Sequence, residues 1–210
     1  MSTFYMGVIV PSAILLPLVI ALFQYRYWQM PERLVFFYLL LSGVFNLAAK
    51  LTSDRAVNNL PLLHLYTVAE FCLLAAVFRS IFTVAWIRRA LLALMILFPV
   101  VAWIYIRQTD SLFSYNVVPR FLSSLLLTGL CLYFLIRDLA RPADARSRFN
   151  LIVVVGMLLY FSGASALFGL AESIRQDKEL NTVIWNIHAT FVLIMYLIFG
   201  VAYLNIPKTK

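Results

Sequence analysis

The stretch from residue 60 to residue 78 reads LPLLHLYTVAEFCLLAAVF, and it decides the fold class of the chain. About 17–25 mainly apolar residues are needed for one helical crossing of a bilayer, and this stretch has that length. It nevertheless contains His64 and Glu70. A carboxylate at the bilayer midplane costs about 2.5–3.5 kcal/mol on insertion scales. The stretch therefore predicts a membrane-spanning helix whose polar residues face other helices or a cavity.

The composition of the whole chain indicates that lipid is its solvent. Of the 210 residues, 63% are hydrophobic and 12% are charged, and the mean hydropathy is +0.91. Soluble domains average about 45–50% apolar and about 25% charged residues. We predict an all-α polytopic membrane protein with one seven-helix domain over residues 1–210. Its expected spans are 5–24, 34–50, 60–78, 90–106, 118–136, 149–171 and 182–204.

The distribution of Lys and Arg predicts the orientation of the chain. The first, third and fifth connectors and the C-terminal tail hold eleven of these residues, and the remaining connectors hold six. The excess marks the cytoplasmic side, so we expect the N-terminus outside and the C-terminus in the cytoplasm. The net charge of +8 is scattered singly or in short groups between apolar runs. This pattern fits a chain whose partner is the lipid bilayer, and it predicts no nucleic-acid partner.

Polar residues from distant parts of the chain fall at one depth. Counting about 1.5 Å of rise per residue places Glu70 about 14 Å below the start of its helix, and the others also lie in the expected outer half. Such residues face the bundle interior or a watery cavity. We expect either a structural hydrogen-bond cluster or an outward-facing pocket. The candidate ligand-binding residues are Asn46, His64, Tyr66, Glu70, Ser165, Trp185, Asn186 and His188.

The helical period narrows the partners that Glu70 can have. Tyr66 precedes Glu70 by four residues and shares its face, whereas His64 lies about 120° away at 100° per residue. We expect Glu70 to bond with Tyr66, or across helices with Asn46, Asn186 or His188, and to be a neutral acid in this apolar setting. Arg120 is expected at the outer mouth of the fifth helix.

Two catalytic arrangements are conceivable for some of these residues. The GASA sequence around Ser165 is similar to the GxSG of rhomboid proteases but departs from it at the final glycine, so a dyad of Ser165 with His188 is a hypothesis only. His64, Glu70 and His188 offer zinc-type ligands, but the chain has no HExxH spacing. We predict no metal or other cofactor.

The segment YFSGASALFGLA, residues 160–171, is dense in small residues. The simplest interpretation is close helix packing of the small-xxx-small type, for instance through Ser162 and Ala166.

Two stretches support a family resemblance: NNLPLLHLYTVAEFCLLAAVFR at residues 58–79, and TVIWNIHATFVLIMYLIFGVAYL at residues 182–204. They resemble the compact seven-helix sensor modules that precede bacterial histidine kinases or occur as free-standing membrane proteins. The resemblance implies signal sensing at a bacterial inner membrane. The topology is also similar to SWEET-type and PQ-loop carriers, although their proline–glutamine signature is absent.

Three functions follow as expectations. The first is a receptor-like protein that binds a small or lipid-like ligand in the outward pocket, bounded by the second, third, sixth and seventh helices, and signals through its basic inner loops to a separate partner. The second is a small carrier with a 3+1+3 helix plan, in which Glu70 is a protonatable coupling group. The third is an intramembrane hydrolase.

Overall fold

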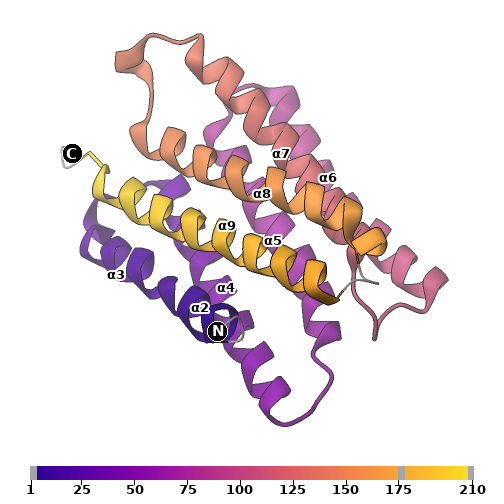
Figure 1. Cartoon of the computed structure of the whole chain (residues 1–210). Coiled ribbons are helices and arrows are strands. Elements are labelled where there is room, and N and C mark those ends of the chain that lie inside the picture. The colour runs from indigo at the N-terminus through magenta and orange to yellow at the C-terminus, as the bar shows by residue number, and fades with distance from the viewer. Residues whose placement is uncertain (1–3, 175–177, 208–210) are drawn as a thin grey trace.

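The computed structural model describes residues 4–174 and 178–207, and every regular element in that part is helical. The side chains of residues 171–174 and 178 are not described. Figure 1 shows the helices as a bundle of long rods joined by short connectors. The elements are η1 (Tyr5–Ile9), α2 (Val10–Ala13), α3 (Leu15–Phe23), η2 (Tyr25–Tyr27), α4 (Met30–Asp54), α5 (Leu60–Ile81), α6 (Ala85–Thr109), α7 (Val117–Leu139), η3 (Ala143–Ala145), α8 (Arg148–Ile174) and α9 (Lys178–Leu204).

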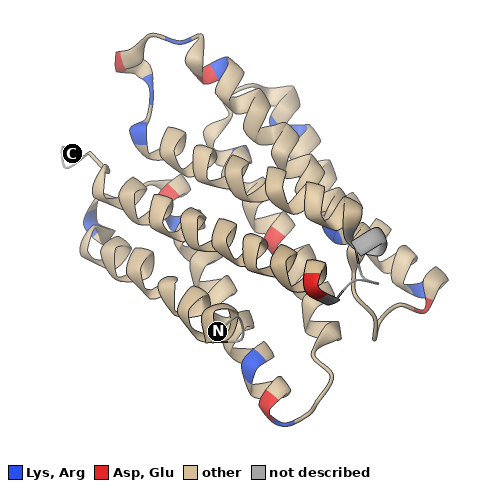
Figure 2. Cartoon of the chain, in the orientation of Figure 1, with Lys and Arg blue, Asp and Glu red and all other residues tan. Residues whose placement is uncertain are grey.

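Seven helical spans in the described chain are long and apolar enough to cross a membrane, the first formed by η1, α2 and α3 together. This confirms the predicted all-α, seven-span architecture. The outer surface is rich in exposed apolar side chains, such as Phe23 at 81% and Ile136 at 71% of full exposure. Figure 2 shows that charged residues gather mainly at helix ends and in connectors. An apolar exterior with satisfied helical backbones is typical of a multi-pass membrane protein.

Six of the seven spans close into a ring. Each of α4, α5, α7, α8 and α9 packs on the next in this order, and the first span completes the circuit by contacting both α9 and α4. The fourth span, α6, packs mainly on the outside of α5. In Figure 1, α7, α8 and α9 run side by side across the face of the bundle. The interior of the ring is therefore where buried polar groups can meet.

The second and fourth spans exceed their predicted lengths by the most. The second and fourth were expected at 34–50 and 90–106, but α4 and α6 extend beyond these limits at both ends. In α4 the Glu32 carboxylate accepts a bond from the Gln29 backbone N–H at 2.9 Å, which forms a capping box. Caps add polar first turns to a helix, so an apolar window misses them.

The first span is interrupted at Ile14, between α2 and α3. It begins with the π-helical segment η1, and Pro11 and Pro17 follow within α2 and α3. A proline lacks the N–H that would continue the helical ladder, so the break has an evident sequence cause. The broken segment brings Met6, Val10 and Pro11 to the interior cavity described below.

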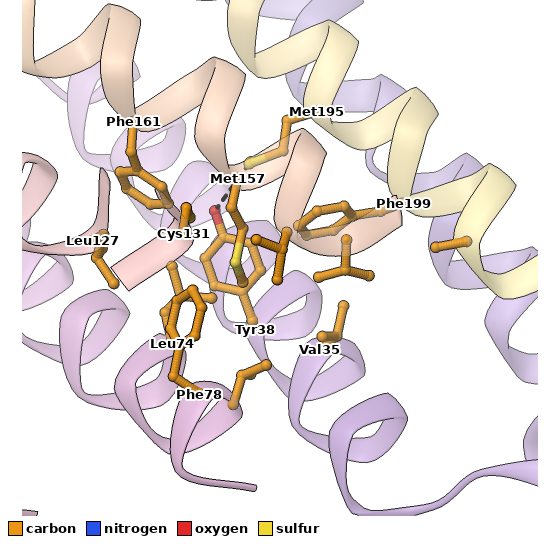
Figure 3. Close-up of a cluster of buried hydrophobic side chains, with 14 of the residues drawn as sticks. Val35, Tyr38, Leu74, Phe78, Leu127, Cys131, Met157, Phe161, Met195 and Phe199 are labelled. Carbon is orange, nitrogen blue, oxygen red and sulfur yellow. Dashed lines mark hydrogen bonds between the residues drawn. The ribbon is translucent and has the colours of Figure 1, made fainter. Parts of the chain in front are cut away.

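The packed part of the bundle is apolar and aromatic. Figure 3 shows Tyr38 surrounded by side chains from α4, α5, α7, α8 and α9, among them Phe78, Met157 and Phe199. Tyr38, Phe78 and Phe199 are at most 1% exposed. Because the Tyr38 ring is in this cluster while its hydroxyl reaches Glu70, Tyr38 joins the apolar core to the polar site.

Close approach of α8 to α9 depends on glycines. A Cβ at Gly163 would lie 2.7 Å from the Phe191 ring, and one at Gly156 would lie 2.9 Å from Ile198. Ser162 and Ala166, the pair offered as an example of close helix packing, are exposed instead. The small-residue interpretation was right for the segment but wrong for the pair, because the tightest approach falls on the other face of the helix.

Candidate functional site

Glu70 of α5 lies at the centre of a buried polar network. Its side chain is fully buried. Its Oε1 accepts hydrogen bonds from the Tyr66 hydroxyl at 2.8 Å and from the Tyr38 hydroxyl at 3.2 Å, and its Oε2 pairs with the Arg120 guanidinium of α7. Ser42 bonds the Tyr66 oxygen at 3.0 Å, as the donor because the Tyr66 proton is directed at Glu70. Three helices thus satisfy the carboxylate.

Arg120, like Glu70, is buried and has several bonding partners. It is 4% exposed, and its second terminal nitrogen donates to the Tyr160 hydroxyl at 2.5 Å. The guanidinium carbon lies 5.6 Å from the Tyr66 ring centroid and 5.9 Å from that of Phe168. Cation–π contacts of this kind stabilise a guanidinium that has lost its water.

These contacts correct two expectations. Arg120 does not stay at the mouth of its helix, because counting rise per residue locates a Cα and ignores the reach of a long side chain. Glu70 does not depend only on hydroxyl, amide or imidazole partners, because the Arg120 guanidinium pairs with it. The predicted bond with Tyr66 is confirmed. Direct bonds to Asn46, Asn186 or His188 are not formed.

A cavity of about 450 Å³ lies over this network, and we call it the main cavity. Its walls come from the first span and from α4, α5, α7, α8 and α9, with Tyr115 from the α6–α7 connector. The four expected wall helices are all present, and the first span and α7 join them. Eight aromatic residues line it: Tyr38, Phe45, Tyr66, Tyr115, Tyr160, Phe168, Trp185 and Tyr196.

The structure brings half of the predicted ligand-binding residues to the main cavity. Asn46, Tyr66, Trp185 and His188 line it, and Glu70 lies directly behind the lining residues that bond to it. Trp185 and His188 share one face of α9, with ring centroids 5.7 Å apart, as their spacing predicted. This grouping arises from α4, α5 and α9, which only the closed ring brings together.

His64 has a different role from the expected one. It is 5% exposed, is absent from the cavity lining, and contacts the backbone of the α6–α7 connector. Its Nε2 lies 3.0 Å from the Ser111 carbonyl oxygen and 3.1 Å from that of Ser114. Because carbonyls only accept, Nε2 carries the proton. The ring therefore anchors a connector, whereas we had expected it in the pocket.

Asn186 and Ser165 also lie away from the main cavity. Asn186 lines a separate surface depression with Val183, Ile187, Thr190 and Phe191. The Ser165 hydroxyl donates to the Ser162 carbonyl of its own helix at 2.9 Å. Both residues were expected in the pocket, and both point elsewhere because their helix faces are rotated from those of Tyr160 and His188.

The geometry supports neither catalytic arrangement. Within the described chain no hydrogen bond joins Ser165 to His188, whose ring instead contacts those of Tyr160, Phe168 and Trp185. No group of three or more His, Cys, Asp or Glu side chains in that part of the chain is placed to hold a metal ion. The hydrogen bond that the hypothetical Ser165–His188 dyad requires is therefore not formed between these two described residues.

Four residues of the site escaped the sequence reasoning. Arg120 was expected only at the mouth of its helix, and Tyr38, Tyr160 and Tyr196 were not among the candidate residues. The available signal was electrostatic. A buried carboxylate requires a cation or several donors, and Arg120 is a cation whose helix begins at the same end of the bundle as α5.

Comparison of the chain with protein-family models, with curated proteins and with solved structures finds no match in any of the three. The function is therefore inferred from the cavity, its charged pair and the arrangement of the helices.

Proposed function

We propose that this chain is a receptor-like integral membrane protein, of a bacterial inner membrane, that binds a small or lipid-like ligand in the main cavity. The observation that carries the proposal is the coincidence of a cavity of about 450 Å³ with a buried Glu70–Arg120 pair at its base. Ligand sites are commonly cavities of about 300–1,000 Å³ with apolar walls and a few polar groups. Ionisable residues inside membrane spans typically mark such functional sites.

A purely structural role explains the site less well. A buried ion pair is weak evidence for stability, because well-packed apolar residues often replace it without loss. A cluster that serves only helix packing also gains from closing on itself, since every unfilled space forfeits dispersion contacts. Here the polar network borders an open space with aromatic walls instead.

The charge distribution supports an outward-facing cavity. The main cavity adjoins the α4–α5 and α6–α7 connectors, which were expected outside. Because Arg120 is buried, the expected outer connectors keep five of their six basic residues against eleven on the other side. Of these residues, Arg175, Lys208 and Lys210 lie outside the described part of the chain. By the positive-inside rule, this count favours an external N-terminus more strongly than the count that includes Arg120 among the outer residues.

In this proposal the signal leaves the protein at the end of the bundle opposite the main cavity. There the exposed arginines include Arg26, Arg33, Arg88, Arg89 and Arg137. A separate cytoplasmic protein with an acidic surface would be attracted to such a group.

A pocket-filling variant tests the proposal. Ala189 of α9 lines the main cavity, whereas Ala166 of α8 is exposed and outside it. The purified chain is screened against a small-molecule library by thermal unfolding in detergent. We expect compounds that raise the Tm of the wild type and of Ala166→Phe but not of Ala189→Phe. Equal responses from all three proteins would contradict binding in the cavity.

A carrier is the second candidate, because the fourth span lies outside a ring formed by the first three and last three spans, as a 3+1+3 plan requires. A coupling role for Glu70 would require its contact with Arg120 to open during transport. Uptake into proteoliposomes of a compound found in the thermal screen, lost in Glu70→Gln, would favour the carrier over the receptor.

A further inference from the structure

The charged side chain that lines the main cavity is positive, and its negative partner lies behind the wall. Arg120 lines it, while the Glu70 carboxylate is fully buried and outside the lining. The ion pair is therefore a dipole with its positive end toward the cavity. Among the described residues that line the cavity none is Asp or Glu. A ligand in this space meets one cationic group, hydroxyls and amides, and no negative charge in direct contact.

Arg120 has donors to spare. A guanidinium carries five N–H groups. The described hydrogen bonds occupy one on each terminal nitrogen, with Glu70 and Tyr160 as acceptors. The Tyr66 and Phe168 rings lie near the guanidinium, at 5.6 and 5.9 Å. Planar guanidinium edges bind carboxylates through paired, charge-assisted hydrogen bonds. The remaining donors thus match an anionic oxygen acceptor.

The rest of the cavity is lined by apolar side chains that suit the hydrocarbon part of a ligand. Phe45, Phe168, Trp185, Val192 and Met195 line it, together with the broken first span. A fully polar anion would leave water in contact with these apolar side chains. A fully apolar ligand would leave the remaining Arg120 donors without an acceptor. An amphipathic molecule satisfies both regions.

From these observations we infer that the ligand is a small amphipathic carboxylate, with its carboxylate on Arg120 and its hydrocarbon part against the aromatic walls. This inference rests on the proposed function, because it names the ligand class of the same cavity. Aliphatic and aromatic acids share the recognised chemistry.

Equilibrium binding of radiolabelled decanoate to the full chain in lipid nanodiscs tests the inference, with empty nanodiscs subtracted. Unlabelled decanoate, decanol, decyltrimethylammonium and 4-phenylbutanoate serve as competitors. Charge-assisted hydrogen bonds contribute about 1.5–3 kcal/mol, which corresponds to roughly 10–150-fold in affinity. We expect decanoate to compete at least about tenfold more strongly than decanol, and the ammonium not to compete. The order of the two acids then identifies an aliphatic or an aromatic ligand.

Two variants separate the possible failures. Glu70→Gln/Arg120→Gln removes both charges together and avoids an unpaired buried ion, and we expect it to bind decanoate no better than decanol. Ala189→Phe should abolish binding of every competitor, while Ala166→Phe should not. Equal affinity of the wild type for decanoate and decanol would overturn the carboxylate inference and leave the binding cavity intact. No saturable binding of any probe would overturn the inference, and the library screen then decides the proposed function separately.

Discussion

The two ends of the bundle bury their side chains by different means. At the cavity end, next to the α4–α5 and α6–α7 connectors, Glu70, Arg120 and several tyrosine hydroxyls surround an open space. At the opposite end, aromatic rings fill the interior, with Phe149 and Tyr203 centroids 5.2 Å apart and Trp28 6.2 Å from Tyr203. The cavity end therefore contains an open space next to a paired buried charge, whereas side chains fill the interior of the opposite end.

The difference shows how a membrane protein can keep a cavity open. Lipid is as apolar as a leucine core, so helices gain little from apolar burial and depend on close packing and hydrogen bonds. At the opposite end, a neutral hydrogen bond joins the buried Tyr203 hydroxyl to the Glu32 carbonyl at 2.7 Å. At the cavity end the polar groups have specific partners on three helices, so the walls stay fixed without filling the space. Four experiments can break or sharpen this contrast.

The largest expected effect is loss of the cation at the cavity end. Arg120→Gln leaves Glu70 buried without its counter-ion, which should lower the free energy of unfolding by about 3–5 kcal/mol. Glu70→Gln/Arg120→Gln should recover most of this loss. Reversible unfolding of the purified protein in mixed micelles measures both, with the exposed Arg137→Gln as a control expected within about 0.5 kcal/mol of wild type. A double variant as unstable as the single one would refute the role of the ion pair.

The next effect compares one hydroxyl from each end. Tyr66→Phe removes a bond to a carboxylate and should cost about 1.5–3 kcal/mol, whereas Tyr203→Phe removes a bond to a neutral carbonyl and should cost about 0.5–1.5 kcal/mol. The same unfolding measurement applies to both variants. The contrast between the ends fails if Tyr203→Phe is the more damaging change.

A third comparison adds one or two carbons in each environment. Gly156→Ala places a Cβ 2.9 Å from Ile198 in the packed region, and overpacking of this kind costs about 1–3 kcal/mol. Ala189→Val extends into the main cavity and should change stability by less than about 1 kcal/mol. Gly129→Ala, with nothing within 4 Å of its new Cβ, controls for helix propensity and should be neutral or stabilising. Equal losses at Gly156 and Ala189 would show that the cavity is not open.

The smallest effect concerns the connector that borders the cavity. His64→Phe keeps a ring but loses the bonds to Ser111 and Ser114, which should cost about 0.5–1.5 kcal/mol. Amide hydrogen exchange should accelerate in residues 111–116, with little change in α9. Unchanged exchange in this connector would mean that Asn116, which bonds Thr67 at 2.6 Å, anchors it alone.

The seven helical spans and part of the site could be predicted from the sequence. Apolar windows located all seven spans, because crossing a bilayer requires length and hydropathy that few other structures share. The four-residue spacing of Tyr66 and Glu70 correctly predicted their bond, since a helix fixes such local geometry. Asn46 and His188 line one cavity, as depth counting suggested. Depth counting misplaced Asn186 and Ser165, because depth carries no information on which way a helix is rotated.

What the sequence determined by itself is the solvent of this protein, its seven spans and the presence of buried charge within them. The partner of Glu70 was decided only by the tertiary structure, because the ring places α7 against α5 and the long Arg120 side chain reaches inward to the carboxylate. The six-residue spacing already separated His64 from Glu70, but the neighbours that each one contacts were decided by the tertiary structure. Six residues apart on one helix, they face different neighbours, so one anchors a connector and the other supports the wall of a cavity.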